Sequence, residues 1–478
     1  MSVSRHTAYN LMGTAAPILV ALVSIPIYIN LIGEQRYGML SIAWILLGYF
    51  GVFDLGIGRA AAQRIASLDK TQATRGQAFW TALTLNSVLG ALGGLAIWPA
   101  AHYFFAHQFQ IENDLKPEVL QALPWLVLAL PLSTITGVLS GALQGVERFL
   151  QLNAINATGS ILFQTLPLLA AWLWTPDLGI LMPVAIGSRL LGVIFLFFSC
   201  LRHVTSNLTP SFNTHEAREL LKFGGWITVS SLVSPVMVMA DRFIIGAIIG
   251  AKAVTQYTVP FQLAERSTIF PSALSSSLFP RFAKDSDHDG KQIAVISVRL
   301  LLVLMTPVMV AAILLADPFL RIWISSEFSE QSALTLQILL IGFWINGVAR
   351  IPHARLQATG HPNVVAICHL MELIPYLVVL FLGLNVGGVA GAAAAFTLRV
   401  FADHILLSAQ AGTLRSTIFL TWCGLVFLGA ALLLSQQSLS TPIMVSAGLV
   451  LFALTIFWSI MQAPGALKKW IKNLYKRA

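Results

Sequence analysis

The chain has 478 residues, of which 56% are hydrophobic and only 10% are charged. In a soluble globular protein roughly a quarter of all residues are charged. This composition excludes a soluble globular enzyme or nucleic-acid-binding domain, because water could not cover so much apolar surface. The net charge of +9 is therefore interpreted first as a signal of membrane orientation.

Apolar runs long enough to span the hydrocarbon, about 20 residues each, recur along nearly the whole chain. The first covers residues 8–32 and the last covers residues 444–460. The runs number about fourteen, and none has the short alternating pattern of barrel strands. Because a helix satisfies its own backbone hydrogen bonds in lipid, we predict an all-α integral membrane protein with about fourteen transmembrane helices.

Two landmarks recur at one equal spacing. Gly33, at the end of the first predicted span, is matched by Gly250 at the end of the seventh, and Arg64 is matched by Arg281. The pattern predicts two six-helix lobes related by an axis along the membrane normal, a layout typical of transporters. The expected divisions are an N-lobe at 1–222, a C-lobe at 223–412, two further helices at 413–462 and a basic tail at 463–478.

Basic residues gather in alternate connections between the spans, and again in the tail. Examples are Arg59, Arg64, Lys70 and Arg75 in one loop and Lys468, Lys469 and Lys472 at the end. By the positive-inside rule, both termini lie in the cytoplasm, which requires an even number of crossings.

Five charged residues fall near the middle of predicted spans, where each costs about 2.5 to 3.5 kcal/mol on insertion scales and is a functional candidate by default. They are Arg189, Glu265, Arg266, Glu372 and Arg399. Arg399 has Asp403 one turn along its own helix, so this pair has a structural interpretation as well. Arg189 and Glu372 must find partners on other helices, in water or on a substrate.

Five further charges lie nearer the membrane faces: Asp54, Arg59, Asp241, Arg242 and Arg350. At that depth, gates, ion pairs or anchors are the simpler interpretation. The histidines His353, His361 and His369 show no metal-ligand spacing, so neither a metal nor a cofactor is expected. A midplane carboxylate such as Glu265 or Glu372 can take up a proton when it is desolvated, so coupling to H⁺ or Na⁺ is expected.

At this point the sequence resembles a known family, the polysaccharide transporter branch of the multidrug/oligosaccharidyl-lipid/polysaccharide exporter superfamily. The resemblance rests on the order of several short motifs. These are Tyr37-Gly38, Phe53-Asp54-Leu55-Gly56 with Arg59, Leu143-Gln144-Gly145 with Arg148-Phe149, and Asp241-Arg242 before Ile244-Ile245-Gly246. It implies a V-shaped fold of two six-helix lobes plus two C-terminal helices.

The resemblance also implies a bacterial inner-membrane flippase. Its substrate would be an undecaprenyl-pyrophosphate-linked repeat unit of O-antigen, capsule or exopolysaccharide, moved from the inner to the outer leaflet. Arginine matches phosphate oxygens with a planar fork of donors. The predicted pyrophosphate- or sugar-binding residues are Arg266, Arg189, Arg399, Arg350 and Arg59. The predicted ion-coupling or gating residues are Glu265, Glu372, Asp54, Asp241, Arg242 and Asp403.

Three alternatives stay open on the sequence. A multidrug or cation antiporter of the same superfamily should line its path with carboxylates and aromatic residues rather than arginines. A peptidoglycan-precursor flippase resembles this chain, but the first span has no arginine beyond Arg5. An envelope polymerase or glycosyltransferase would need a large outside loop with catalytic acids, and the longest, residues 102–118, is short. A polymerase and glycosyltransferases are nevertheless expected partners of the flippase.

Overall fold

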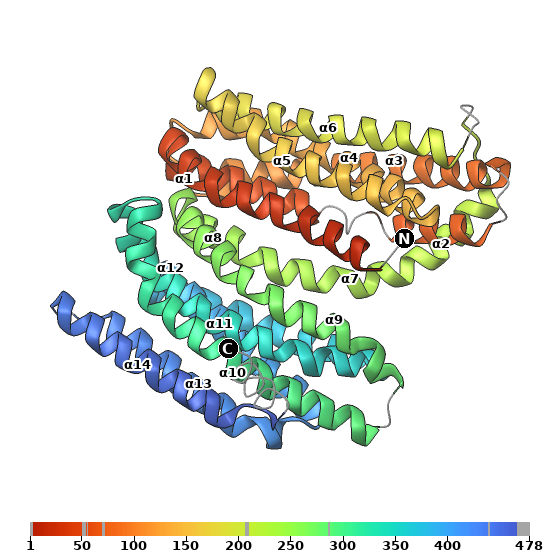
Figure 1. Cartoon of the computed structure of the whole chain (residues 1–478). Coiled ribbons are helices and arrows are strands. Elements are labelled where there is room, and N and C mark those ends of the chain that lie inside the picture. The colour runs from red at the N-terminus through yellow and green to blue at the C-terminus, as the bar shows by residue number, and fades with distance from the viewer. Residues whose placement is uncertain are drawn as a thin grey trace. The chain divides into compact units, whose positions relative to one another are not determined.

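The computed structural model describes residues 3–49, 54, 56–68, 72–205, 210–284, 287–437 and 440–465. In these residues the chain forms fourteen α-helices and no strand (Figure 1), which confirms the predicted all-α class. The helices form two compact units, Met1–Thr255 and Gln256–Ala478. The lobe boundary expected at residue 222 lies within a helix of the first unit, and the two units are described separately below.

The first unit contains seven helices, a π-helical turn and the start of an eighth helix. They are α1 (Val3–Tyr49), α2 (Ile57–Ser67), α3 (Gln72–Tyr103), the π turn (Phe104–Gln108), α4 (Lys116–Gly145), α5 (Phe149–Leu173), α6 (Leu178–His203) and α7 (Thr214–Ile248).

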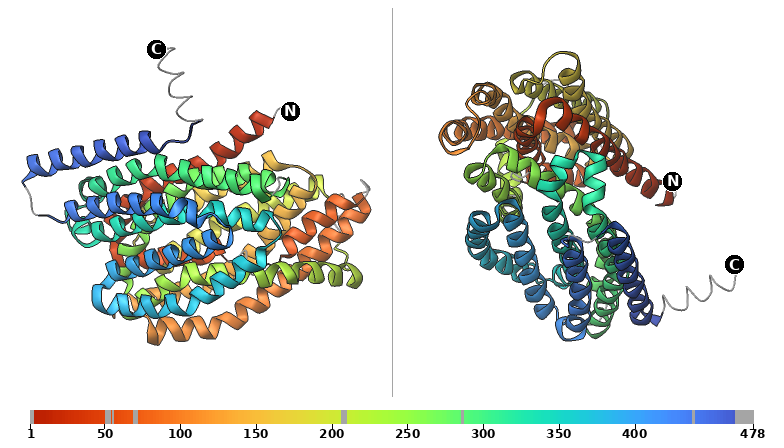
Figure 2. Two further views of the ribbon diagram at one scale, coloured as in Figure 1. Left: turned by 90° about the horizontal axis from the view of Figure 1, so that it is seen from below. Right: turned by 90° about the vertical axis from the view of Figure 1, so that its left-hand side faces the viewer.

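The second unit contains most of α8 and all the later helices. They are α8 (Ala251–Glu265), a 3₁₀ turn (Arg266–Thr268), α9 (Ile269–Lys284), α10 (Asp287–Trp323), α11 (Ser326–Ala358), α12 (Pro362–Gln410), α13 (Leu414–Ser435) and α14 (Thr441–Gln462). Within each unit the long helices run roughly along one direction (Figure 2).

Two of the helices are hairpins. α1 has 47 residues and α12 has 49, so a straight helix would measure about 70 Å, more than twice the hydrocarbon thickness of about 30 Å. Each contains one glycine outside the helical region, Gly33 with φ 79° and Gly388 with φ 55°. Glycine tolerates this left-handed backbone because it has no Cβ. The chain reverses at both points, so each hairpin holds two crossings.

In the described residues, counting each hairpin as two crossings, α8–α9 as one interrupted crossing and the short α2 as none gives fourteen crossings. Nine helices in the part of the chain that was searched are long and apolar enough to span a membrane individually. The protein is therefore a multi-pass membrane protein, as its composition predicts.

The first unit is held together by close helix packing around α4. A Cβ added to Gly141 on α4 would lie 2.0 Å from the carbonyl oxygen of Gly58 on α2, so only glycines permit this approach. Beside this contact, Ile57, Ile65 and Phe79 are fully buried in one apolar cluster. The cluster anchors α2, which follows directly on the Asp54 motif.

In the second unit, α11 lies between α10 and α12, and its apolar window is buried more completely than that of any other candidate span in the described residues. Its Trp344 is fully buried and donates from Nε1 to Thr306 Oγ1 of α10 at 3.2 Å. On its other side, the rings of Phe261, Phe343 and Phe396 meet with centroids 4.8 to 5.2 Å apart. α11 and α12 together form the rigid frame of the charged cluster described next.

Candidate functional site

In the first unit, Arg189 of α6 is held by side chains from two other helices. Its guanidinium carbon lies 4.9 Å from the ring centroid of Phe163 on α5, and its Nη1 is 3.4 Å from Ser133 Oγ on α4. Arginine over an aromatic face is a favourable arrangement that keeps donors at the guanidinium edge. As predicted, the contacts come from other helices. The side chain is half-buried, so it is oriented without being sealed into the core.

An aromatic cluster continues from Phe163 toward the hairpin of α1. The rings of Tyr28, Tyr37 and Trp44 pack edge to face or tilted, with centroids 5.3 to 6.1 Å apart, and Trp44 also meets Phe163 at 6.1 Å. The Tyr28 hydroxyl donates to the carbonyl of Gln164 at 2.6 Å. This cluster ties both legs of α1 to α5 and so fixes the wall on which Arg189 rests.

Asp54 caps the break before α2. Its carboxylate accepts from the backbone N–H of Gly56 at 2.7 Å and of Gly58 at 3.3 Å, which satisfies donors at the start of the helix. Gly56 has φ 68°, a value that glycine adopts readily. Arg59 is exposed and lies near enough to attract the carboxylate. These contacts give Asp54 a structural role, and its role in coupling or gating stays a prediction.

Asp241 and Arg242 on α7 form an ion pair. Both are almost completely buried, and Arg242 Nη1 donates to Asp241 Oδ1 at 2.6 Å. The backbone N–H of Arg242 also donates to this oxygen, at 2.8 Å. A buried charge needs such a partner. Of the gate, ion-pair and anchor interpretations, the geometry of these two residues is that of an ion pair.

In the second unit, the α12 hairpin brings Glu372 and Asp403 together. Glu372 lies sixteen residues before Gly388 and Asp403 fifteen residues after it, so the reversal places them at the same level on facing legs. The two carboxyl groups are electrostatic neighbours and are 6% and 8% exposed. In the described residues no N–H or hydroxyl donor reaches either oxygen of Glu372, and its side-chain partner is the Asp403 carboxyl group. Two adjacent buried carboxyl groups favour sharing a proton or a cation.

Two histidines extend this carboxylate pair. His369 Nε2 lies 3.5 Å from Asp403 Oδ1. The His369 ring stacks on His353 of α11, with centroids 6.1 Å apart and planes inclined by 17°. We call Glu372, Asp403, His369 and His353 the carboxylate–histidine cluster. An imidazole nitrogen can donate or accept a hydrogen bond, so His369 can serve as either partner of the Asp403 carboxyl group.

Arg399 does not pair with Asp403, in contrast to the structural interpretation of the sequence. Its guanidinium carbon lies over the rings of Tyr376 and Phe396, at 5.2 and 5.3 Å from their centroids, and its charge attracts Glu372 on the other leg. The expectation failed because Arg399 packs on Tyr376 across the hairpin and on Phe396 of its own leg instead of on Asp403. Arg399 therefore lies beside the carboxylate–histidine cluster as a neighbouring positive charge.

Glu265, Arg266 and Arg350 lie at the interruption between α8 and α9. A 3₁₀ turn inside a long helix is frequent at functional hinges, and it begins here at Arg266. Glu265 and Arg266 are both exposed, and no ion pair joins them in the residues that the structure describes. Arg350 of α11 is half-buried and is attracted by Glu265.

The sequence interpretation gave His353 and His369 no functional role and did not predict the Arg36–Glu118 and Arg64–Glu216 ion pairs. His369 and His353 gave no signal by spacing, although His369 lies one turn before Glu372. Glu118, at the end of the longest outside loop predicted from the sequence, accepts from Arg36 Nε at 2.9 Å and from the backbone N–H of Leu178 at 3.2 Å. Among the residues searched, no group of three or more His, Cys, Asp and Glu residues has a geometry that could hold a metal ion.

Comparison with known proteins places the chain in a family. Residues 30–333 match the family described as polysaccharide biosynthesis protein. A Shigella flexneri protein named "Putative O-antigen transporter" is 28% identical over 411 residues, which cover 85% of this chain and 97% of that protein.

Solved structures share the fold at low sequence identity. The lipid II flippase MurJ in an inward closed conformation has a TM-score of 0.68 at 14% identity, covering 93% of this chain and 98% of MurJ. An inward-facing multidrug resistance MATE transporter of the MOP superfamily also has a TM-score of 0.68, at 13% identity, covering 86% of this chain and 98% of that one. The chain, with the fold of these transporters, therefore belongs to the polysaccharide biosynthesis protein family.

Proposed function

We propose that this protein is a flippase that moves an undecaprenyl-pyrophosphate-linked oligosaccharide from the inner to the outer leaflet of the bacterial inner membrane. Both termini would lie in the cytoplasm, and a polysaccharide polymerase and glycosyltransferases would act beside it. The family, the transporter named for O-antigen and the MurJ-like fold support this proposal. The observation that carries it is Arg189, held half-buried on the Phe163 ring inside the first unit.

Arginine in this position suits a pyrophosphate rather than a cationic drug. A guanidinium presents a planar fork of donors to phosphate oxygens and stays charged when partly desolvated. Arg266 at the α8–α9 interruption is exposed and can offer the same chemistry from the second unit. We assign pyrophosphate binding to Arg189 and Arg266, with Arg350, Arg399 and Arg59 as further candidates.

The test is polysaccharide export in a deletion strain. The deletion should remove surface polysaccharide and accumulate lipid-linked precursor on the cytoplasmic face. The wild-type gene should restore export, and the Arg266→Glu variant should not. Normal export after deletion would contradict the flippase, and altered drug resistance together with normal export would favour the multidrug antiporter.

We further propose that transport is coupled to a proton or sodium gradient through the carboxylate–histidine cluster. The argument is that the 94% buried Glu372 has another carboxyl group, Asp403, as its side-chain partner, so a shared proton or a cation would offset the desolvation and repulsion of the two charges. His369 lies within reach of the Asp403 charge.

Coupling can be measured in inside-out membrane vesicles supplied with lipid-linked glycan. Collapsing the gradient of the coupling ion should slow wild-type translocation. Glu372→Gln and Asp403→Asn keep the side-chain shape but should make any remaining translocation insensitive to the gradient. Glu330→Gln is the matched control, because Glu330 is 66% exposed. Wild-type translocation that ignores both gradients would contradict coupling.

A further inference from the structure

We infer that α7 moves with the first six crossings as one body, although by sequence it opens the second repeat. The inference rests on the proposed transport function, because it concerns what moves during transport. α7 belongs to the compact unit that ends at Thr255. Contacts bind its start to α2 and α3 and its far end to the loop before α4, all within that unit. The rocking of one lobe against the other would then divide the chain near residue 255 rather than near residue 222.

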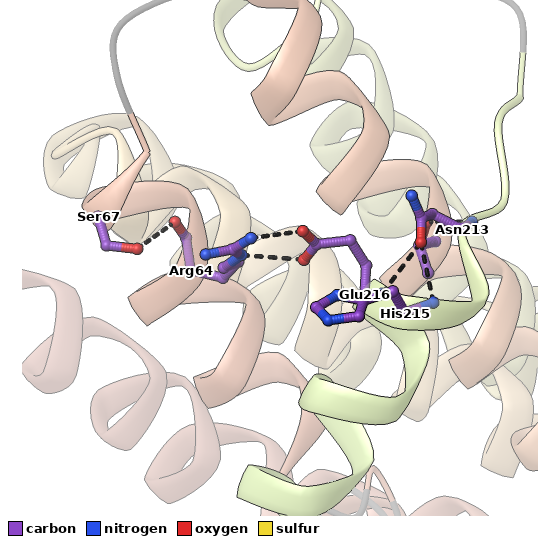
Figure 3. A network of polar contacts seen from close by, with 6 residues as sticks. Arg64, Ser67, Asn213, His215 and Glu216 are labelled. Atoms are coloured by element: carbon purple, nitrogen blue, oxygen red, sulfur yellow. Dashed lines mark hydrogen bonds and ion pairs between the residues drawn. The ribbon is translucent and has the colours of Figure 1, made fainter.

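An ion pair holds the first turn of α7 (Figure 3). Arg64 of α2 donates from Nε to Glu216 Oε2 at 2.9 Å, and its Nη2 donates to the other carboxylate oxygen. This two-point pairing fixes the angle between the guanidinium and the carboxylate as well as their distance. The Glu216 side chain is 13% exposed and the Arg64 side chain 40% exposed, so the carboxylate is the better shielded partner of the pair. α2 itself is anchored to α4 by the glycine contact described above.

The cap of α7 is docked as well. The Asn213 side chain accepts from the backbone N–H of His215 at 2.9 Å and of Glu216 at 3.2 Å. This N-cap fixes the first turn and therefore the position of Glu216. The backbone N–H of Asn213 in turn donates to Thr81 Oγ1 of α3 at 3.1 Å. Two earlier helices, α2 and α3, thus hold the start of α7.

The far end of α7 is held by the loop between the π turn and α4. The Gln110 N–H donates to the Gly246 carbonyl at 3.1 Å, and the Gln110 carbonyl accepts from the Ala251 N–H at 3.2 Å. The Phe109 ring lies directly on Gly246, where an added Cβ would be 2.0 Å from a ring carbon. Gly246 permits this contact because it lacks a Cβ. The loop therefore binds the chain both just before the end of α7, at Gly246, and just after it, at Ala251.

The two ends lie thirty residues apart, about 45 Å along a helix. A rotation that carried α7 away from the first unit would have to break three sets of contacts together. These are the Arg64–Glu216 ion pair, the hydrogen bond from Asn213 to Thr81, and the two backbone hydrogen bonds of Gln110. Gly250 follows α7 with φ 119°, a value that favours glycine. Its backbone conformation ends α7 and starts α8 as a separate helix.

A disulfide at the far end tests the inference directly. A Cβ built on Gly250 lies 3.7 Å from the Gln110 Cβ, within the range of about 3.5 to 4.5 Å that a disulfide needs. The Gln110→Cys/Gly250→Cys variant is made in a chain whose native cysteines, Cys200, Cys368 and Cys423, are replaced. Export by the oxidised and reduced forms of the same protein is compared, so the strain at Gly250 is common to both.

We expect the oxidised form to export within twofold of the reduced form. A loss of tenfold or more on oxidation, reversed by reductant, would overturn the inference, because α7 would then have to leave this loop. If wild-type protein itself exports no glycan, the proposed function fails instead. For that case, spin labels at the exposed Gln63 of α2 and Glu219 of α7 give an independent reading. One distance population in detergent and in lipid supports the inference, and two populations contradict it.

Charge reversal tests the other end. Arg64→Glu and Glu216→Arg should each reduce export at least tenfold, and the double variant should recover most of it, because the pair is restored with its charges exchanged. Arg218→Glu, a reversal at an exposed position on the same helix, should export normally. Full export by both single variants would show that the Arg64–Glu216 ion pair is not needed to hold the start of α7.

Discussion

The α12 hairpin predicts a specific and asymmetric sensitivity to alanine. An ideal Cβ on Gly391 would lie 1.9 Å from the carbonyl oxygen of Gly383 on the facing leg. The usual contact distance is above 3 Å, so Gly391→Ala must push the legs apart by more than 1 Å at this level. Gly391 lies between the reversal at Gly388 and the Asp403 carboxyl group. The displacement therefore acts on the frame that brings the carboxylate–histidine cluster together.

The cost follows from the packing. Inserting one methyl group into a site that has no room typically costs about 1 to 3 kcal/mol. The full cost is expected at Gly391, because the obstacle there is backbone and cannot move aside as a flexible side chain could. The matched control is Gly429→Ala on α13, where an added Cβ meets nothing within 4 Å. Alanine should stabilise that position by roughly 0.4 to 1 kcal/mol, because it restricts the unfolded chain and has the higher helix propensity.

The assay is thermal unfolding of both purified variants and the wild type in one detergent. We expect Gly391→Ala to unfold at a lower temperature than the wild type and Gly429→Ala at an equal or higher temperature. Equal unfolding temperatures for Gly391→Ala and the wild type would refute the close approach of the two legs. The register that pairs Glu372 with Asp403 would then lose its support.

Three further outcomes are expected. Asp54→Asn keeps a capping oxygen and should unfold close to the wild-type temperature, whereas Asp54→Ala should lose about 1 kcal/mol of stability, measured by thermal unfolding. Glu118→Gln, which weakens a partly exposed pair with Arg36, should cost at most about 1 kcal/mol in the same measurement. Arg189→Lys should reduce polysaccharide export about tenfold, about 1.4 kcal/mol, because lysine keeps the charge and loses the planar fork; export equal to wild type would show that charge alone suffices.

The sequence was sufficient to predict the helical class, about fourteen crossings and the charged residues of interest. Each depends on a property that is local or averaged along the chain. Apolar run length reports a crossing, and a charge in such a run, as at Arg189 or Glu372, is costly wherever the helix packs. The two backbone reversals coincide with Gly33 and Gly388. The internal repeat marked Gly33 as the end of the first span, but Gly388 is one of 35 glycines and no pattern distinguished it.

The relations between charged residues could not be predicted in the same way. Spacing along one helix favoured an Arg399–Asp403 pair, yet Asp403 pairs with His369 from the other leg and Arg399 lies over two aromatic rings. The register of a hairpin depends on the residue at which the chain reverses, and a shift of one position would rotate each side chain by about 100°. Such contacts follow from tertiary packing, which a single sequence does not state.

The repeated landmarks separate what the two halves share from what they do not. Gly33 and Gly250 occupy equivalent positions and both have positive φ, at 79° and 119°, so each half interrupts its backbone after its first crossing. Arg64 and Arg281 are equivalent by spacing, but only Arg64 joins an ion pair in the described residues. A duplicated scaffold can thus keep one backbone break and change the charges around it. In this chain, the ion pair that one half gained binds it to α7, the first crossing of the other half.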